Sequence, residues 1–164
     1  MASTLRRFGV SLCIPLALAL TGCGMNAQTL QPYTPAEGVN STTGPVMVRN
    51  LLIVADNTGR GVVSASVTTY TGDTLTGVTG TPQKSDGTLG SPLVVTAAGL
   101  PTVLPSNTLV VLTDPPLKVA VTSPDLKPGL LADVTLTFAK SGPVTLASPV
   151  ISSDDPAFEH ITIG

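Results

Sequence analysis

Side chains that could ligate a metal ion or act as a nucleophile are scarce in this sequence. Its 164 residues include one His (His160), two Cys (Cys13 and Cys23) and three Met. A Ser-His-Asp triad would have to recruit His160, which lies among the last five residues, where chains are usually poorly tied down. We therefore expect His160 to be a solvated tail residue and the protein not to be an enzyme.

Sequence motifs for common cofactors are also missing. Gly59-Arg60-Gly61 lacks the further glycine and the helix of a dinucleotide-binding loop, and no Asp/Asn/Gly spacing matches a calcium-binding EF-hand. Aromatic residues make up only 3% of the chain, so there is no obvious stacking platform for rings. The sequence predicts no cofactor.

Residues 1–22 have the organisation of a signal peptide. The first seven residues contain Arg6 and Arg7 and no acid, and an apolar run follows at residues 8–20. A bilayer span needs about 20 apolar residues. Because this run is shorter and is broken by Pro15, we interpret it as an export signal rather than as a transmembrane helix.

The apolar run ends in Leu20-Thr21-Gly22-Cys23, which resembles the lipobox of bacterial lipoproteins. The resemblance implies cleavage between Gly22 and Cys23, a diacylglyceryl group on the Cys23 sulfur and acyl chains such as palmitate. Two or three acyl chains on one residue are enough for stable anchoring. We therefore expect a protein that is lipid-anchored at the extracytoplasmic face of the bacterial cell membrane.

The alternative for Cys23 is a free or disulfide-forming thiol. Its only possible partner, Cys13, lies in the segment that the signal peptidase would remove. No intramolecular disulfide would then survive, and the hydrophobic core alone would have to stabilise the exported domain.

Charge argues against nucleic acid as a partner. After removal of residues 1–22, six Lys and Arg remain against ten Asp and Glu, and the cations are scattered singly between Arg49 and Lys140. Binding to nucleic acid or to anionic lipid by charge needs clustered cations. The expected partners are therefore the membrane, through the lipid, and an unidentified protein of the cell envelope.

Residues 23–45 predict the lipidated Cys23 followed by a flexible tether. They consist mainly of Asn, Gln, Thr, Ser, Gly and Pro, which bury too little apolar surface to offset the entropy of ordering. About 20 such residues reach roughly 25 Å as a coil, enough to hold a domain clear of the lipid headgroups.

Residues 46–150 predict an all-β domain, followed by a C-terminal tail at 151–164. Short apolar runs bounded by Gly, Pro, Asn or Asp recur through the domain, which is typical of an antiparallel sandwich or barrel. Alternation is clearest at residues 134–138, where Val134, Leu136 and Phe138 should face the core. The expected strands are 46–55, 62–70, 75–79, 92–97, 109–113, 117–122, 131–139 and 144–150.

Parts of this domain, at residues 73–78, 103–117, 126–129 and 134–142, resemble the periplasmic copper(I) chaperone family that serves the Cu(A) site of cytochrome oxidase. The chain is also similar to actinobacterial envelope lipoproteins in which this domain follows a lipobox and a polar tether. The resemblance implies an antiparallel Greek-key sandwich, cupredoxin-like or immunoglobulin-like, over about residues 46–150.

The copper ligands of that family are not matched here. The family binds Cu(I) through a His and Met pair on one loop and a His-x-Met pair about twenty residues later. At the second position this chain has Lys118-Val119-Ala120, so that Lys118 replaces His and Ala120 replaces Met, and residues 81–97 contain neither His nor Met. The expectation is a domain with no metal at the family site, acting as a non-catalytic binding or presentation module.

A second hypothesis remains open. Met25, Met47 and His160, which flank the domain, could act as ligands of a degenerate copper carrier, brought together in a dimer.

Overall fold

Strands dominate the folded part of the chain. The computed structural model describes residues 37–163, which belong to the compact unit Ala36–Gly164. Within this range there is no α-helix, and a single 3₁₀ turn, η2, covers Pro156–Phe158. No helix in the described residues is long and apolar enough to cross a membrane. The strands are β1 (Val39–Thr43), β2 (Val46–Ala55), β3 (Arg60–Thr69), β4 (Asp73–Pro82), β5 (Val94–Ala98), β6 (Thr102–Leu104), β7 (Val110–Val111), β8 (Lys118–Thr122), β9 (Leu131–Phe138) and β10 (Gly142–Ser152).

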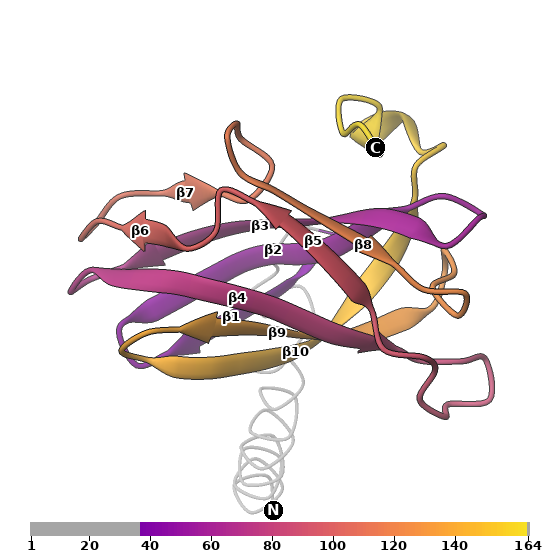
Figure 1. Ribbon diagram of the computed structural model, residues 1–164, viewed down its shortest axis with the longest axis horizontal. Helices are drawn as coiled ribbons and strands as arrows, with labels where there is room; N and C mark the ends of the chain where they lie inside the picture. The colour runs from indigo at the N-terminus through magenta and orange to yellow at the C-terminus, as the bar shows by residue number, and fades with distance from the viewer. Residues whose placement is uncertain (1–36, 164) are drawn as a thin grey trace, which may run out of the picture. The chain divides into compact units, whose positions relative to one another are not determined.

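The strands form two layers that share β10. One layer has the order β5-β8-β3-β2, with β1 added to β2 and β7 added to β3, and the other has the order β10-β9-β4-β6. In Figure 1, β2, β3 and β8 lie above β4, β9 and β10. β10 pairs with β9 over most of its length and then, at Val150–Ser152, with β2 in parallel. The expected antiparallel, all-β sandwich is confirmed, with this one parallel pair.

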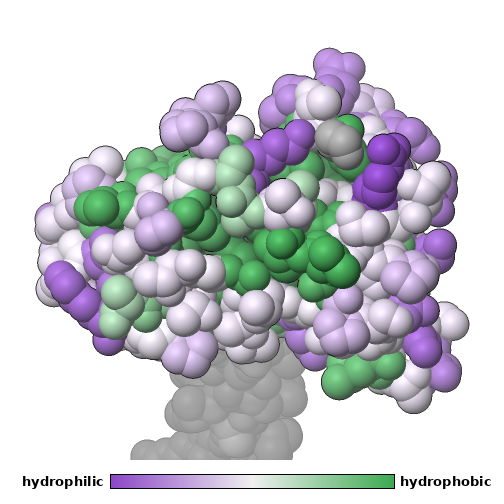
Figure 2. Space-filling model, viewed as in Figure 1, coloured by the Kyte–Doolittle hydropathy of each residue, from purple (hydrophilic) through white to green (hydrophobic). Residues whose placement is uncertain are grey.

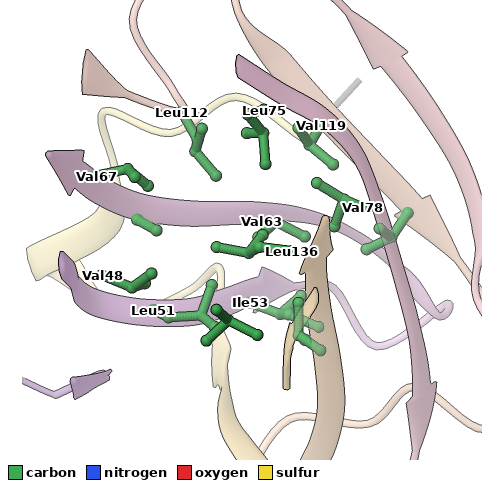
Figure 3. Close-up of a cluster of buried hydrophobic side chains, with 14 of the residues drawn as sticks. Val48, Leu51, Ile53, Val63, Val67, Leu75, Val78, Leu112, Val119 and Leu136 are labelled. Atoms are coloured by element: carbon green, nitrogen blue, oxygen red, sulfur yellow. The ribbon is translucent and has the colours of Figure 1, made fainter. Parts of the chain in front are cut away.

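The core between the layers is filled by aliphatic side chains. Figure 3 shows side chains of β2, β3, β4, β8 and β9 pointing toward one another, and Phe138 is the one ring in this cluster. Val134, Leu136 and Phe138 are at most 2% exposed, so their predicted inward orientation is confirmed. On the outward face of the same hairpin, the Thr135 and Thr145 hydroxyls are hydrogen-bonded at 2.8 Å. Thr thus provides a polar surface without charge.

The expected tether is wrong at its C-terminal end, because Val39–Thr43 forms β1 rather than coil. Polar side chains hold this strand: Arg49 donates to the Ser41 carbonyl at 2.7 Å, and the Asn50 amide donates to Asn40 Oδ1 at 2.8 Å. Because polar contacts rather than buried apolar side chains hold β1, its sequence needs no apolar alternation and shows none. Residues 23–36 and the expected signal peptide at 1–22 lie outside the described residues.

A buried carboxylate fixes the β9–β10 turn. Asp73, 4% exposed at the start of β4, accepts hydrogen bonds from the backbone amides of Thr74 (2.7 Å), Lys140 (2.9 Å) and Ser141 (3.0 Å), and from Ser141 Oγ (2.7 Å). Burial raises the pKa of the Asp73 carboxyl, but these hydrogen bonds outweigh it and lower the pKa below its ordinary value. Asp73 thus ties β4 to the hairpin that joins both layers.

Replacing Asp73 by Asn should destabilise the domain, because an amide cannot accept all four hydrogen bonds and carries no charge. We expect the free energy of unfolding at pH 7 to fall by about 2–3 kcal/mol, measured by urea denaturation. The pKa of Asp73 is lowered on folding, so its stabilising effect is complete above the pKa of the unfolded chain, about 4, and is lost as the pH falls through the folded value. The difference between wild type and Asp73→Asn should therefore narrow in acid.

The matched control is Asp154→Asn, since Asp154 is exposed. It should change stability by less than about 0.5 kcal/mol. Equal unfolding midpoints for the two variants at pH 7 would contradict the structural role of Asp73.

Candidate functional site

Strand β8 carries Lys118 and Ala120. These are the two positions at which the sequence resemblance expects copper ligands and this chain has none. They alternate with Val119 and Val121, which face the core, so Lys118 and Ala120 are on the outward side of the sheet, and both are half-buried. Ala120 is opposite Val62 on β3 and Lys118 is opposite Ala98 on β5. The two side chains thus share one strip of the outer surface.

Residues 81–97, where the family has its other ligand pair, lie mainly beside the C-terminal end of β8, away from Lys118. The Ser91 amide donates to Asp125 Oδ2 at 2.7 Å, and Ser123 Oγ donates to the Ser91 carbonyl at 2.9 Å, which places the loop beside the residues that follow β8. Lys118 begins β8, about 13 Å from its last residue, Thr122. Only β5, at the end of the expected loop, runs back toward Lys118.

His160 belongs to a packed segment rather than to a detached tail. β10 extends to Ser152, and Asp155 then caps η2 by accepting a hydrogen bond from the Ala157 amide at 2.9 Å. Phe158 is 9% exposed and packs on Leu52 and Val54, which face outward from β2, together with Ile151, Ile161 and Ile163. The C-terminal segment, yellow in Figure 1, covers this outer face, although His160 itself is exposed.

Sequence reasoning missed this packing, although a signal for it was present. Phe158, Ile161 and Ile163 are three large apolar residues within six positions, beginning two residues after Pro156. Such a cluster needs cover, and the outward apolar residues of β2 provide it.

Met47 lies far from His160 in the same domain. Met47 is near the start of β2, where its sulfur accepts a hydrogen bond from the Tyr70 hydroxyl at 3.4 Å. His160 shares a pocket with Val62, which pairs with Val54 near the end of β2. Along β2, Met47 is seven residues, or about 20 Å, from Val54, the residue opposite Val62. Met47 and His160 therefore cannot bind one ion within a single copy.

The other candidate residues do not form a metal site in the described range. Met25, Gly22 and Cys23 lie outside the described residues. Within residues 37–163, no three His, Cys, Asp or Glu side chains are grouped so that they could hold a metal ion.

Instead, the structure brings Lys118 and His160 together in a pocket of about 540 Å³. Val62 and Leu117, at 2% and 7% exposure, are its most buried lining residues, while His160, Pro115 and Pro116 are exposed at its rim. The pocket lies between the start of β8, the preceding loop and the C-terminal segment. Its lining residues are Val62, Thr113, Asp114, Pro115, Pro116, Leu117, Lys118, His160, Ile161 and Thr162.

Exposed apolar side chains mark a second surface. Figure 2 shows apolar side chains in the middle of the face that carries β4, β5 and β8, with the most hydrophilic ones mainly toward its edges. Val94 on β5 is 70% exposed and Val103 on β6 is 69% exposed. Tyr70 and Leu109, at 56% and 61%, flank the short strands β6 and β7.

Comparison with known proteins identifies the fold. No protein-family model matches the chain, and no curated protein matches its sequence. Among solved structures, the apo PCuAC domain from PmoF1 aligns with a TM-score of 0.52 and 22% identity, over 69% of this chain and 98% of that domain. The domain has a PCuAC-like fold. The apo and copper-bound PCuAC domains of PmoF2 also align, each with 18% identity, at TM-scores of 0.48 and 0.47, over 71% and 70% of this chain and 98% of each domain.

Phe158 should be the residue that holds the C-terminal segment on the PCuAC-like domain. Phe158→Ala removes the ring from its contacts with Leu52 and Val54 and should lower the free energy of unfolding by about 3 kcal/mol. Amide hydrogen exchange of residues 153–163 should accelerate in the variant.

Leu89→Ala is the matched control, since Leu89 is 61% exposed. It should leave both stability and exchange near wild type. A stable Phe158→Ala variant with unchanged exchange would show that the segment is held by other contacts.

Proposed function

We propose that the protein is a cell-envelope lipoprotein, anchored through Cys23 at the extracytoplasmic face of the membrane, whose PCuAC-like domain is a non-catalytic binding module. The lipobox-like sequence that ends at Cys23 and the apolar run before it support the anchor. The tether shortened by β1 still leaves residues 24–38 between Cys23 and the first strand.

The observation that carries the proposal is that the domain has a PCuAC-like fold but very few Met, His or Cys side chains that could bind copper. One of the aligned structures is a copper-bound PCuAC domain. Here the residues from 37 to 163 include one Met, near the start of β2, one His, at the pocket near the other end of β2, and no Cys. Cu(I) favours several thioether, thiolate or imidazole ligands, so neither residue alone suffices.

Lys118 strengthens this interpretation. Lys118 and Ala120 lie on the same strip of β8, at the positions where the sequence resemblance to the copper chaperone family expects His and Met. A cation there repels a copper ion, and the Ala120 methyl group has no lone pair to offer. We therefore propose that the site has lost its metal ligands.

A binding module needs a surface for its partner. The exposed Val103 lies on β6, Leu109 directly precedes β7, and Tyr70 directly follows β3. The hydrogen bond from the Asn107 amide to the Thr69 carbonyl at 2.7 Å ties the β6–β7 connection to the end of β3. Exposed apolar side chains that lie together are typical of protein interaction sites. We propose that this surface contacts another protein of the envelope.

The anchor is tested by substitution of the two cysteines in cells that process lipoproteins. Cys23→Ser should abolish incorporation of labelled palmitate and leave an uncleaved precursor, because the acylated sulfur is gone. Cys13→Ser, in the segment to be removed, should retain both labelling and cleavage. Normal lipid labelling of Cys23→Ser would refute the anchor.

Loss of the metal site is tested by Cu(I) titration against a competing chelator. The wild-type domain should form no one-to-one complex. The double variant Lys118→His, Ala120→Met should bind Cu(I), because two soft ligands then lie on one strip of β8 and the first of them lines the pocket with His160. The matched control is Thr135→His, Thr137→Met, which creates the same spacing on β9, in the other layer. It should bind at least tenfold more weakly.

The same titration decides between the two functions. A one-to-one Cu(I) complex of the wild-type chain that disappears in His160→Ala would favour the degenerate copper carrier, with Met25, Met47 and His160 joined across a dimer. Equal binding by the β8 and β9 double variants would contradict the assignment of Lys118 and Ala120 to a lost metal site.

A further inference from the structure

The pocket beside Lys118 and His160 is not needed by a module that presents an apolar surface. Its volume of about 540 Å³ lies within the roughly 300–1,000 Å³ of small-molecule sites. It is built from three separate parts of the chain, namely β3, the residues leading into β8, and the C-terminal segment. A site for a small ligand is therefore present independently of the anchor and of the surface at β6 and β7.

One side of the pocket is apolar. Val62 and Leu117 are buried and Ile161 is half-buried, and the rings of Pro115 and Pro116 continue this lining to the rim. An alkyl group placed against these side chains would lose contact with water, at about 25 cal/mol per Å² of apolar area removed. The lining therefore favours a ligand with an apolar body.

The Lys118 ammonium lacks an anionic partner among the described residues. The ion pair in that range joins Arg60 to Asp56, and no hydrogen bond from the Lys118 amine is formed to residues 37–163. Lys118 lines the pocket and is half-buried, and a lysine in such a position can bury its alkyl stem while its ammonium group stays accessible to a ligand. An anionic group bound in the pocket would provide the missing partner, and the imidazole N–H of His160 is a second donor at the same pocket.

Asp114 limits the charge of the ligand. Its carboxylate also lines the pocket, although it forms no ion pair with Lys118, and the two side chains together carry no net charge. A dianion such as a phosphate monoester would meet this carboxylate and be disfavoured. A single negative charge can pair with Lys118 and avoid Asp114.

We propose that this pocket binds an amphiphilic monocarboxylate, with the carboxylate at Lys118 and His160 and the alkyl chain on Val62, Leu117 and Ile161. The C-terminal segment is part of the site, because it contributes both His160 and Ile161. This activity goes beyond the proposed function and does not depend on the acylation of Cys23.

The probe is hexanoate, titrated into the full chain held in phospholipid nanodiscs, with empty nanodiscs measured alongside. His160 is the only histidine, so its imidazole proton signals form a single reporter that needs no assignment. Saturable binding of one hexanoate should shift these signals, while the methyl signal of Met47, which lies outside the pocket near the start of β2, should stay in place.

Two substitutions separate the site from general lipid binding. Lys118→Met keeps an unbranched side chain that is one atom shorter but removes the charge, and should weaken hexanoate binding at least tenfold. Lys127→Met is the matched control, since Lys127 is exposed and lies outside the pocket, and should bind like wild type. Unfolding midpoints of both variants confirm that each is folded.

Two further ligands test the head group. Hexan-1-ol, which lacks the charge, and hexanedioate, which carries two, should each bind at least tenfold more weakly than hexanoate. The proposal is overturned if hexanoate leaves the His160 signals unchanged, if Lys118→Met binds as well as Lys127→Met, or if the alcohol binds as tightly as the acid.

Discussion

β10 is the strand on which the other parts of the domain depend, because it hydrogen-bonds to both layers. Its first part forms the hairpin with β9, and its last three residues pair with β2. The same crossing carries the chain to the outer side of β2, where Phe158 and its neighbours are buried. The pocket therefore exists because β10 delivers the C-terminal segment to the outer face, close to the start of β8.

The sequence was most informative where one face of a strand is buried and the other is wet. β2 matches its expected limits of 46–55 as a continuous apolar run that is buried on both faces at its end. β9, by contrast, alternates, and the pattern around Leu136 places the β9–β10 hairpin correctly. Such regions are readable because a shift of one residue would turn every apolar side chain to solvent.

The sequence was least informative where polar groups or distant partners determine the structure. β1 is held by Arg49 and Asn50 and has almost no apolar pattern, while β6 is only three residues long. The pocket could not be predicted, because it needs β3, the entry to β8 and the C-terminal segment to meet in space. The sequence motif draws attention to Lys118, but only the folded structure shows that His160 lines the same pocket.

This domain has a PCuAC-like fold but few side chains that could bind copper, so the fold does not depend on metal binding. No metal ion is needed to hold this domain together. Burial accounts for the aliphatic core between the two layers, and the hydrogen bonds to Asp73 account for the β9–β10 turn. The outer strip of β8 is free to carry other side chains without loss of the core, because Val119 and Val121 alone face inward. A scaffold of this kind can exchange one ligand for another at little structural cost.

The polar strand β1 also determines where the domain can be cut. A fragment that began at residue 46, the boundary suggested by hydrophobic pattern, would lose the strand that pairs with residues 46–51 of β2. The backbone N–H and C=O groups along that half of β2 would then be left as an open edge, since β10 covers only Ile53–Ala55. Such a fragment is expected to associate edge to edge with its own copies, whereas one that retains residues from 37 onward keeps β2 covered.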